Sequence, residues 1–247
     1  MSLIERNIDG NIGEVILNRI DKRNALNSEM IGEMKNALIE FSINKNIKII
    51  SFRSSGKDFS VGADINELYS MNEESAFAFR QLMRDLVYAI DGCKKITSFF
   101  LTGFSLGGGF EISQWADLRI AATDSKIGQP EINIGVNAGA GGNSKLVEIV
   151  GYSNAMYLSL SGKILSAEEA KMLGIVQNVV SGFDEYMQIL RNISLKPEEL
   201  VKGIKGSMKT YLREGIDRSF DVEEKIFIHN VPSKESKELM EKFLKKK

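Results

Sequence analysis

The side chains best suited to chemistry in this sequence are two glutamates close to glycine-rich stretches. Glu111 directly follows Phe110 and the run Gly107-Gly108-Gly109, and Glu131 stands at the start of a second glycine-rich loop. Glycines expose backbone N–H groups, and such groups at the start of a helix can hold an oxyanion or a phosphate. Carboxyl groups beside these amides suggest acid–base work. The pattern indicates proton transfer next to an anion that the backbone stabilises.

Both features also have a purely structural interpretation. Three glycines permit close packing of a strand against a helix, and taken alone they slightly favour that interpretation. A glutamate is most often a solvated surface charge. The setting favours catalysis, because α/β proteins place their sites in loops at strand ends. The glycine run is not a phosphate-binding Walker loop, since no Gly-Lys-Ser/Thr follows it, and it lacks the spacing of a dinucleotide fingerprint.

A third candidate segment covers residues 59–65, Phe-Ser-Val-Gly-Ala-Asp-Ile. Its small residues would let the main chain approach a ligand, and the backbone N–H of Ala63 is the most interesting group. The Asp64 side chain is expected to cap the N-terminus of a helix.

Composition argues against several other kinds of site. The 247 residues include one histidine and one cysteine, so neither a Cys/His zinc cluster nor an internal disulfide can form, and we expect no metal site. A serine triad would depend on His229. Lys plus Arg number 32 and Asp plus Glu 33, and this balance argues against nucleic-acid and membrane partners. Without a signal peptide or about 18 successive apolar residues, we expect a cytoplasmic protein.

The elements that must position these residues alternate between strand and helix. Alternation over the first 180 residues predicts an α/β fold with mostly parallel strands, opened by a hairpin around Asp9-Gly10. Asn27 and Ser166 are predicted to cap helices. We expect one compact body, with a core over residues 1–180 and a helical region over 181–247. The strands are predicted at 3–8, 13–18, 47–52, 96–101 and 118–122, and the helices from 28, over 79–90, from 111, over 143–150 and from 167.

Several motifs, in order and spacing, resemble the enoyl-CoA hydratase/isomerase (crotonase) superfamily over essentially the whole chain. The matching segments are Leu17-Asn18-Arg19, Asp21-Lys22-Arg23-Asn24-Ala25-Leu26, Gly62-Ala63-Asp64-Ile65, Gly107-Gly108-Gly109-Phe110-Glu111, Gly128-Gln129-Pro130-Glu131 and Gly139-Ala140-Gly141-Gly142. The resemblance implies a crotonase-like spiral of ββα units with a C-terminal helical region. It also implies assembly as a homotrimer or a dimer of trimers.

The resemblance further implies the ligand and the reaction. The ligand would be an acyl-CoA thioester, with coenzyme A as part of the substrate and no separate cofactor. The N–H groups of Ala63 and Gly108 would form an oxyanion hole for the thioester carbonyl. Both glutamate positions of the hydratases are filled, by Glu111 and Glu131, whereas isomerases commonly retain one. We therefore expect water to be added across the C2–C3 double bond of a 2-enoyl-CoA, with the division of proton transfers left open.

Two further sets of residues follow from the resemblance. Gly139 would lie beside the attacking water, and Lys246 could assist binding, although a solvated helix end is the simpler interpretation of the C-terminal lysines. The residues expected to bind coenzyme A are Arg23, Ala25, Leu26, Ala63, Asp64 and Ile65.

Some positions depart from the family pattern. Asn137-Ala138 replaces an apolar residue followed by proline in the loop that many hydratases use around the acyl group, so the acyl specificity stays open. Another reaction on the same scaffold, such as double-bond isomerisation or decarboxylation of an acyl-CoA, is the alternative enzyme hypothesis. Some relatives bind RNA, and the balanced charge argues against that function here.

Overall fold

The computed structural model describes residues 2–245, and the chain forms two compact units, Met1–Arg191 and Asn192–Lys247. The division between the units follows residue 191, whereas the helical region was expected to begin at residue 181. Helix α8 (Phe183–Ser194) begins within the first unit, where Tyr186 and Leu190 are fully buried. Tyr186 stacks on Phe100, with ring centroids 4.6 Å apart, so this helix is anchored to the core.

The first unit is built on a six-stranded sheet within the described residues, with strand order β1-β2-β3-β4-β6-β9. The pairs are parallel except for the antiparallel hairpin of β1 and β2, which turns at Asp9 and Gly10 as predicted. The predicted α/β fold with mostly parallel strands is confirmed. The strands are β1 (Ile4–Asp9), β2 (Ile12–Leu17), β3 (Ile49–Ser54), β4 (Ile96–Leu101), β6 (Leu118–Ala122) and β9 (Asn178–Val180).

A second, smaller sheet contains β5 (Phe104–Leu106), β7 (Lys126–Gly128) and β8 (Leu165–Ser166). The sequence pattern predicted none of these strands, and residues 103–109 were expected to be one continuous turn. Two or three residues are too few to show the alternation that identifies a strand. Helix α4 (Gly108–Ser113) begins earlier than expected near Glu111, because Gly107 has a φ of +51° that turns the chain into the helix.

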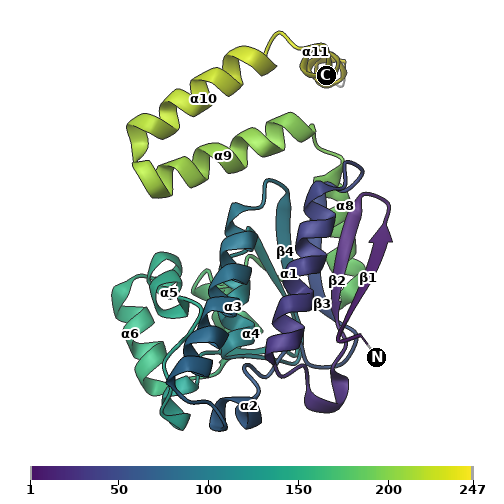
Figure 1. Cartoon of the computed structure of the whole chain (residues 1–247). Coiled ribbons are helices and arrows are strands. Elements are labelled where there is room, and N and C mark those ends of the chain that lie inside the picture. The colour runs from purple at the N-terminus through teal and green to yellow at the C-terminus, as the bar shows by residue number, and fades with distance from the viewer. Residues whose placement is uncertain (1, 246–247) are drawn as a thin grey trace. The chain divides into compact units, whose positions relative to one another are not determined.

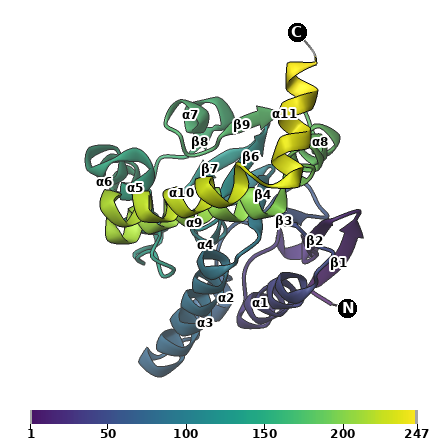
Figure 2. The same cartoon turned by 90° about the horizontal axis from the view of Figure 1, so that it is seen from above.

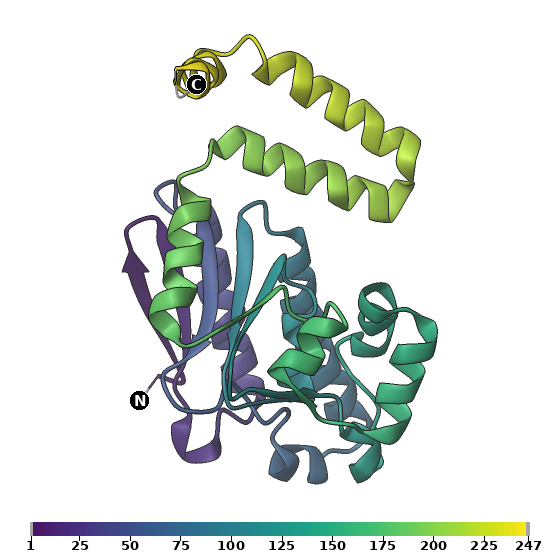
Figure 3. The same ribbon diagram turned by 180° about the vertical axis from the view of Figure 1, so that it is seen from behind.

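The helices of the first unit cover both faces of the main sheet (Figures 1 and 3). Helices α1 and α3 pack against each other on one face, and α8 covers the opposite face. The predicted caps are present, since Asn27 accepts from the Met30 N–H and Ser166 forms a capping box with Glu169. The helices are α1 (Ser28–Ile43), α2 (Ile65–Tyr69), α3 (Glu73–Gly92), α4, α5 (Gly142–Val150), α6 (Tyr152–Ser161), α7 (Ala167–Met172) and the short 3-10 turns η1 (Ile20–Lys22) and η2 (Glu131–Ile134).

Side chains alternate between the two faces along β3 and β4, which places hydroxyl groups on one face of the sheet and aromatic rings on the other. Ser51 and Ser98 face α8, where their hydroxyls lie 2.7 and 3.0 Å from the Tyr186 hydroxyl. Phe52 and Phe99 stack on the other face with ring centroids 4.4 Å apart. Because β3 and β4 are parallel neighbours, the loops that follow them leave the sheet at the same edge. These loops carry the two segments predicted to form the oxyanion hole.

The second unit consists of α9 (Glu198–Glu214), α10 (Ile216–Asn230) and α11 (Lys234–Leu244). Helices α9 and α10 are joined at Gly215 and lie side by side (Figure 1), so that they overlap when seen from above (Figure 2). His229 belongs to α10, and Lys246 lies outside the described residues. Within residues 2–245, no helix combines the length and the apolar character needed to cross a membrane.

Candidate active site

The first unit contains a cavity of about 400 Å³ that gathers the residues predicted to do chemistry. The cavity is lined by Glu111 and Gly108 from α4, by Glu131 from η2 and by Ala63 from the loop before α2. Residues from distant parts of the sequence thus meet in one space.

The two predicted oxyanion-hole segments are in direct contact. A methyl group placed on Gly108 would lie 3.5 Å from the backbone nitrogen of Ala63, and one on Gly62 would lie 3.3 Å from the nitrogen of Gly108. Gly62 has a φ of +98°, which a residue with a side chain rarely adopts. Within residues 2–245, neither the Ala63 N–H nor the Gly108 N–H donates a hydrogen bond to another residue. The cavity therefore has two adjacent donors available to an anionic oxygen.

Pairing with the segment before α1 fixes the direction of the Ala63 amide. The Leu26 N–H donates to the Gly62 carbonyl at 2.8 Å, and the Asp64 N–H donates to the Leu26 carbonyl at 2.9 Å. Ala63 is thereby held in an isolated parallel bridge with Leu26. Its own N–H points away from this ladder, since the bonds on either side of it are already made.

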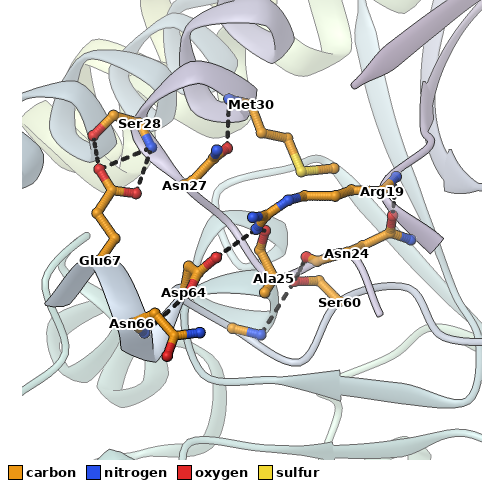
Figure 4. A network of polar contacts seen from close by, with 11 residues as sticks. Arg19, Asn24, Ala25, Asn27, Ser28, Met30, Ser60, Asp64, Asn66 and Glu67 are labelled. Atoms are coloured by element: carbon orange, nitrogen blue, oxygen red, sulfur yellow. Dashed lines mark hydrogen bonds and ion pairs between the residues drawn. The ribbon is translucent and has the colours of Figure 1, made fainter. Parts of the chain in front are cut away.

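A polar network behind this bridge holds the same two segments together (Figure 4). Arg19 Nη1 donates to Asp64 Oδ2 at 2.6 Å and to the Ala25 carbonyl at 2.8 Å. Asp64 Oδ1 accepts from the Asn66 N–H at 3.0 Å, which confirms the predicted cap of α2. The hydrogen bond from Arg19 is the main cause that lowers the pKa of Asp64. The Asp64 carboxylate is thus engaged within the protein.

The residues expected to bind coenzyme A fall into two groups. Ala63 and Ile65 line the cavity, whereas Arg23, Ala25, Leu26 and Asp64 lie outside its lining in the adjoining loops. Gly139, which was expected beside the attacking water, also lines the cavity. Contact of either group with coenzyme A stays a prediction.

Arg23 has a defined position in these loops. Its Nε donates to Asp58 at 2.8 Å, and its guanidinium carbon lies 4.5 Å from the centre of the Phe104 ring, while half of its side chain remains exposed. Burial acts to raise the pKa of Asp58, but hydrogen bonds from Arg23 and from the Phe104 N–H lower that pKa overall. The ion pair and the ring together orient the guanidinium.

Glu111 is buried, with 3% of its surface exposed, and its carboxylate is enclosed by the second glycine-rich loop. The N–H groups of Ala140 and Gly142 donate to Oε1 at 2.9 and 3.0 Å, and that of Gly139 donates to Oε2 at 3.2 Å. Burial raises the pKa of Glu111, and the three N–H groups oppose that rise. The glycine run is visible in the sequence, but its role in holding Glu111 is not.

Glu131 has the opposite environment. Both carboxylate oxygens are buried, and neither has a hydrogen-bond partner among the described residues. Burial, followed by the charge of Glu111, raises the pKa of Glu131 to about 7. A methyl group on Gly107 would lie 3.3 Å from Oε1, so this carboxyl group borders the loop that carries the Gly108 amide.

A chain of side-chain amides supports the wall of the cavity and was not predicted. The Gln114 amide donates to Gln129, whose Nε2 donates to Asn143 Oδ1 at 3.4 Å. Asn143 Nδ2 then donates to Oδ1 of the cavity residue Asn137 at 2.8 Å. Asn137 had been named from the sequence for the loop around the acyl group, and Gln129 only as part of the motif that contains Glu131. The other amides carry no local signal, because their association depends on contacts between distant segments.

Among residues 2–245, no group of three or more His, Cys, Asp or Glu side chains is arranged to hold a metal ion.

Comparison with known proteins supports the predicted relationship. Residues 7–247 match the family model described as enoyl-CoA hydratase/isomerase. Crotonyl-CoA hydratase of Syntrophomonas wolfei is 31% identical over 94% of this chain and 90% of its own length. Short-chain-enoyl-CoA hydratase of Clostridium acetobutylicum is 30% identical, with coverages of 97% and 93%. The crystal structure of enoyl-CoA hydratase from Thermoplasma volcanium superposes with a TM-score of 0.92 at 36% identity, covering 98% of this chain and 97% of that one, which confirms the predicted fold.

Proposed function

Because the chain belongs to the enoyl-CoA hydratase/isomerase family, we propose that it adds water across the C2–C3 double bond of a 2-enoyl-CoA. The observation that carries this proposal is the presence of two carboxyl groups in unlike environments beside two available backbone N–H groups, all lining one cavity. Hydration needs a base for water, an acid for C2 and a stabiliser for the enolate oxygen, and these groups provide all three.

The two amides would act on the thioester oxygen. Attack of water at C3 moves electron density onto that oxygen, and the N–H groups of Ala63 and Gly108 would donate to it. Preorganised donors need no reorganisation during the reaction, and the loss of one such donor typically costs about 3 kcal/mol of transition-state stabilisation.

The environments of the carboxyl groups indicate the division of the proton transfers. Three N–H groups face the Glu111 carboxylate and none of the described residues donates to Glu131, so the proton that the pair shares resides on Glu131. In this mechanism ionised Glu111 accepts a proton from water while the water oxygen bonds to C3. Glu131 then gives its proton to C2 of the enolate. Transfer of the proton from Glu111 to Glu131 restores the starting state.

Turnover of crotonyl-CoA by the purified protein tests the proposal. Loss of the enone absorbance is expected for the wild-type protein, and Glu111→Gln and Glu131→Gln should each lower kcat by about 10²- to 10⁴-fold with a smaller effect on KM. Retention of the wild-type rate in Glu131→Gln would contradict the two-glutamate mechanism. Conversion of a 3-enoyl-CoA to its 2-enoyl isomer without hydration would favour the isomerase hypothesis instead.

A further inference from the structure

The cavity contains one charged side chain that the proposed hydration does not use, Arg80. It belongs to α3, where Ala76, Phe79, Arg80 and Met83 recur at three- and four-residue steps and all line the cavity. The charged lining residues within the described chain are Glu111, Glu131 and Arg80. Arg80 is therefore the one cation in a predominantly apolar wall, on the helix face that a bound ligand would meet.

Arg80 lies beyond the reacting end of the cavity. Met83 marks that end, because its Cε would be 3.3 Å from a methyl group on Gly108. Arg80 precedes Met83 by three residues, about 4.5 Å along the helix axis, and helical side chains lean toward the N-terminus. The raised pKa of Glu131 has burial and Glu111 as its causes, with no cation acting against them. The guanidinium thus stands away from the two glutamates.

The structure also leaves the Arg80 charge available. Among the ion pairs of residues 2–245 none includes Arg80, and its neighbours one turn away, Ala76, Phe77, Met83 and Arg84, carry no negative charge. The cavity amide of Asn137, in contrast, already accepts a hydrogen bond from Asn143. The residue as a whole is exposed, so its charge stays solvated in the free protein.

We propose that Arg80 binds a carboxylate at the far end of the acyl chain, so that the preferred substrates are 2-enoyl-CoA thioesters of dicarboxylic acids. The inference rests on the proposed function and specifies its substrate class. Arg is suited to this role because its planar guanidinium can pair with a carboxylate through two parallel hydrogen bonds. Phe79 and Met83 would contact the methylene groups between the double bond and the carboxylate.

Matched thioesters test this preference in the wild-type protein. The carboxylates are 4-carboxybut-2-enoyl-CoA and 6-carboxyhex-2-enoyl-CoA, and their neutral isosteres are 5-methylhex-2-enoyl-CoA and 7-methyloct-2-enoyl-CoA. We expect kcat/KM to favour at least one carboxylate over its isostere by about tenfold at low ionic strength, and the ratio should fall as salt is added. Equal or better turnover of both isosteres would overturn the proposal.

Substitution assigns the preference to Arg80. Arg80→Met keeps apolar bulk and should reduce the carboxylate-to-isostere ratio about tenfold, whereas Arg80→Lys should retain part of it. Lys94→Gln removes one positive charge just after the same helix, outside the cavity lining, and should leave the ratio at the wild-type value. An equal loss of kcat/KM for all four thioesters in Arg80→Met would place Arg80 against the coenzyme A portion and contradict the proposal.

Binding measurements separate this inference from the proposed reaction. Calorimetry with saturated 4-carboxybutanoyl-CoA and 5-methylhexanoyl-CoA needs no turnover, and tighter binding of the carboxylate is expected. If crotonyl-CoA is not hydrated but the carboxylate thioester still binds more tightly, the proposed hydration is wrong and the proposed carboxylate site at Arg80 is supported. If crotonyl-CoA is hydrated and neither turnover nor binding favours the carboxylate, the reaction stands and the Arg80 site is wrong.

Discussion

The two glutamates differ at the residue scale because one has partners and the other has none. Three backbone N–H groups stabilise the negative charge of Glu111, whereas the buried oxygens of Glu131 meet no donor among the described residues. Ionising Glu131 therefore costs free energy in the folded protein. A residue with such a pKa is suited to proton transfer and should lower stability when it ionises, and both expectations can be measured.

Stability should depend on pH through Glu131. Its pKa rises from an ordinary value of 4.5 to about 7 on folding, so the folded state binds more protons between these limits and the free energy of unfolding falls as pH rises through them. Because one pKa unit corresponds to about 1.4 kcal/mol, the free energy of unfolding should fall by about 3 kcal/mol over this pH range. Denaturant unfolding of Glu131→Gln should show it more stable than wild type at pH 8 and equal to it near pH 4. The exposed Glu224→Gln variant is the control and should be as stable as wild type at each pH. If Glu131→Gln also matched wild type at each pH, the result would contradict a buried Glu131 carboxyl group without a partner.

Activity should depend on the same proton. Glu131 must be protonated to act as the acid, so kcat/KM for crotonyl-CoA is expected to fall about tenfold per unit once pH exceeds about 7. A rate profile from pH 6 to 9 provides the measurement. A profile that stays level to pH 9 would show that Glu131 is not the acid.

At the scale of elements, the loop before α5 has to wrap closely around Glu111. A methyl group on Gly142 would lie 2.6 Å from Cγ of Glu111, closer than real contacts permit. Gly142→Ala should displace the carboxylate or the loop and lower kcat by about 100-fold or more. Gly32→Ala is the matched control, because Gly32 lies within α1 with open space around it. Wild-type turnover in Gly142→Ala would show that the loop can relax without consequence.

Arg19 is a positioning residue at the same scale, since it joins the segment before α1 to the loop that carries the Ala63 amide. Arg19→Met removes the ion pair with Asp64 and a donor to the Ala25 carbonyl, which should lower the free energy of unfolding by about 2 kcal/mol. If the network orients the amide, kcat should fall more than KM rises, and Arg19→Lys should recover part of kcat. Loss of stability with an unchanged kcat would assign Arg19 a purely structural role.

At the scale of the whole molecule, we propose that the chain assembles as a homotrimer or a dimer of trimers. Large apolar side chains on α9 and α10 are more than 60% exposed, an arrangement that favours a protein contact. Sedimentation equilibrium should give about three or six times the mass of one chain, and a monomer at micromolar concentration would contradict the proposal. The side chains concerned are Leu212, Ile216, Phe220, Phe227 and Ile228.

Much of the architecture was predictable because it depends on local patterns. Apolar residues at three- and four-residue steps marked α1 and α3, and Asn27 and Ser166 marked helix starts that the structure confirms. The motifs around Gly62, Gly108 and Glu131 also identified groups that meet in one cavity. The short strands β5, β7 and β8 and the boundary at Arg191 were not predictable, because they depend on pairing and packing between distant segments.

The sequence by itself therefore determined which groups are available: two carboxyl groups and backbone amides, with one histidine and one cysteine in the entire chain. Tertiary structure alone decided how these groups behave. Three amides surround Glu111, burial without a partner raises the pKa of Glu131, and α3 turns Arg80 toward the cavity. The physical reason is that desolvation and Coulomb interactions depend on distances through space, which residue types and spacing do not specify.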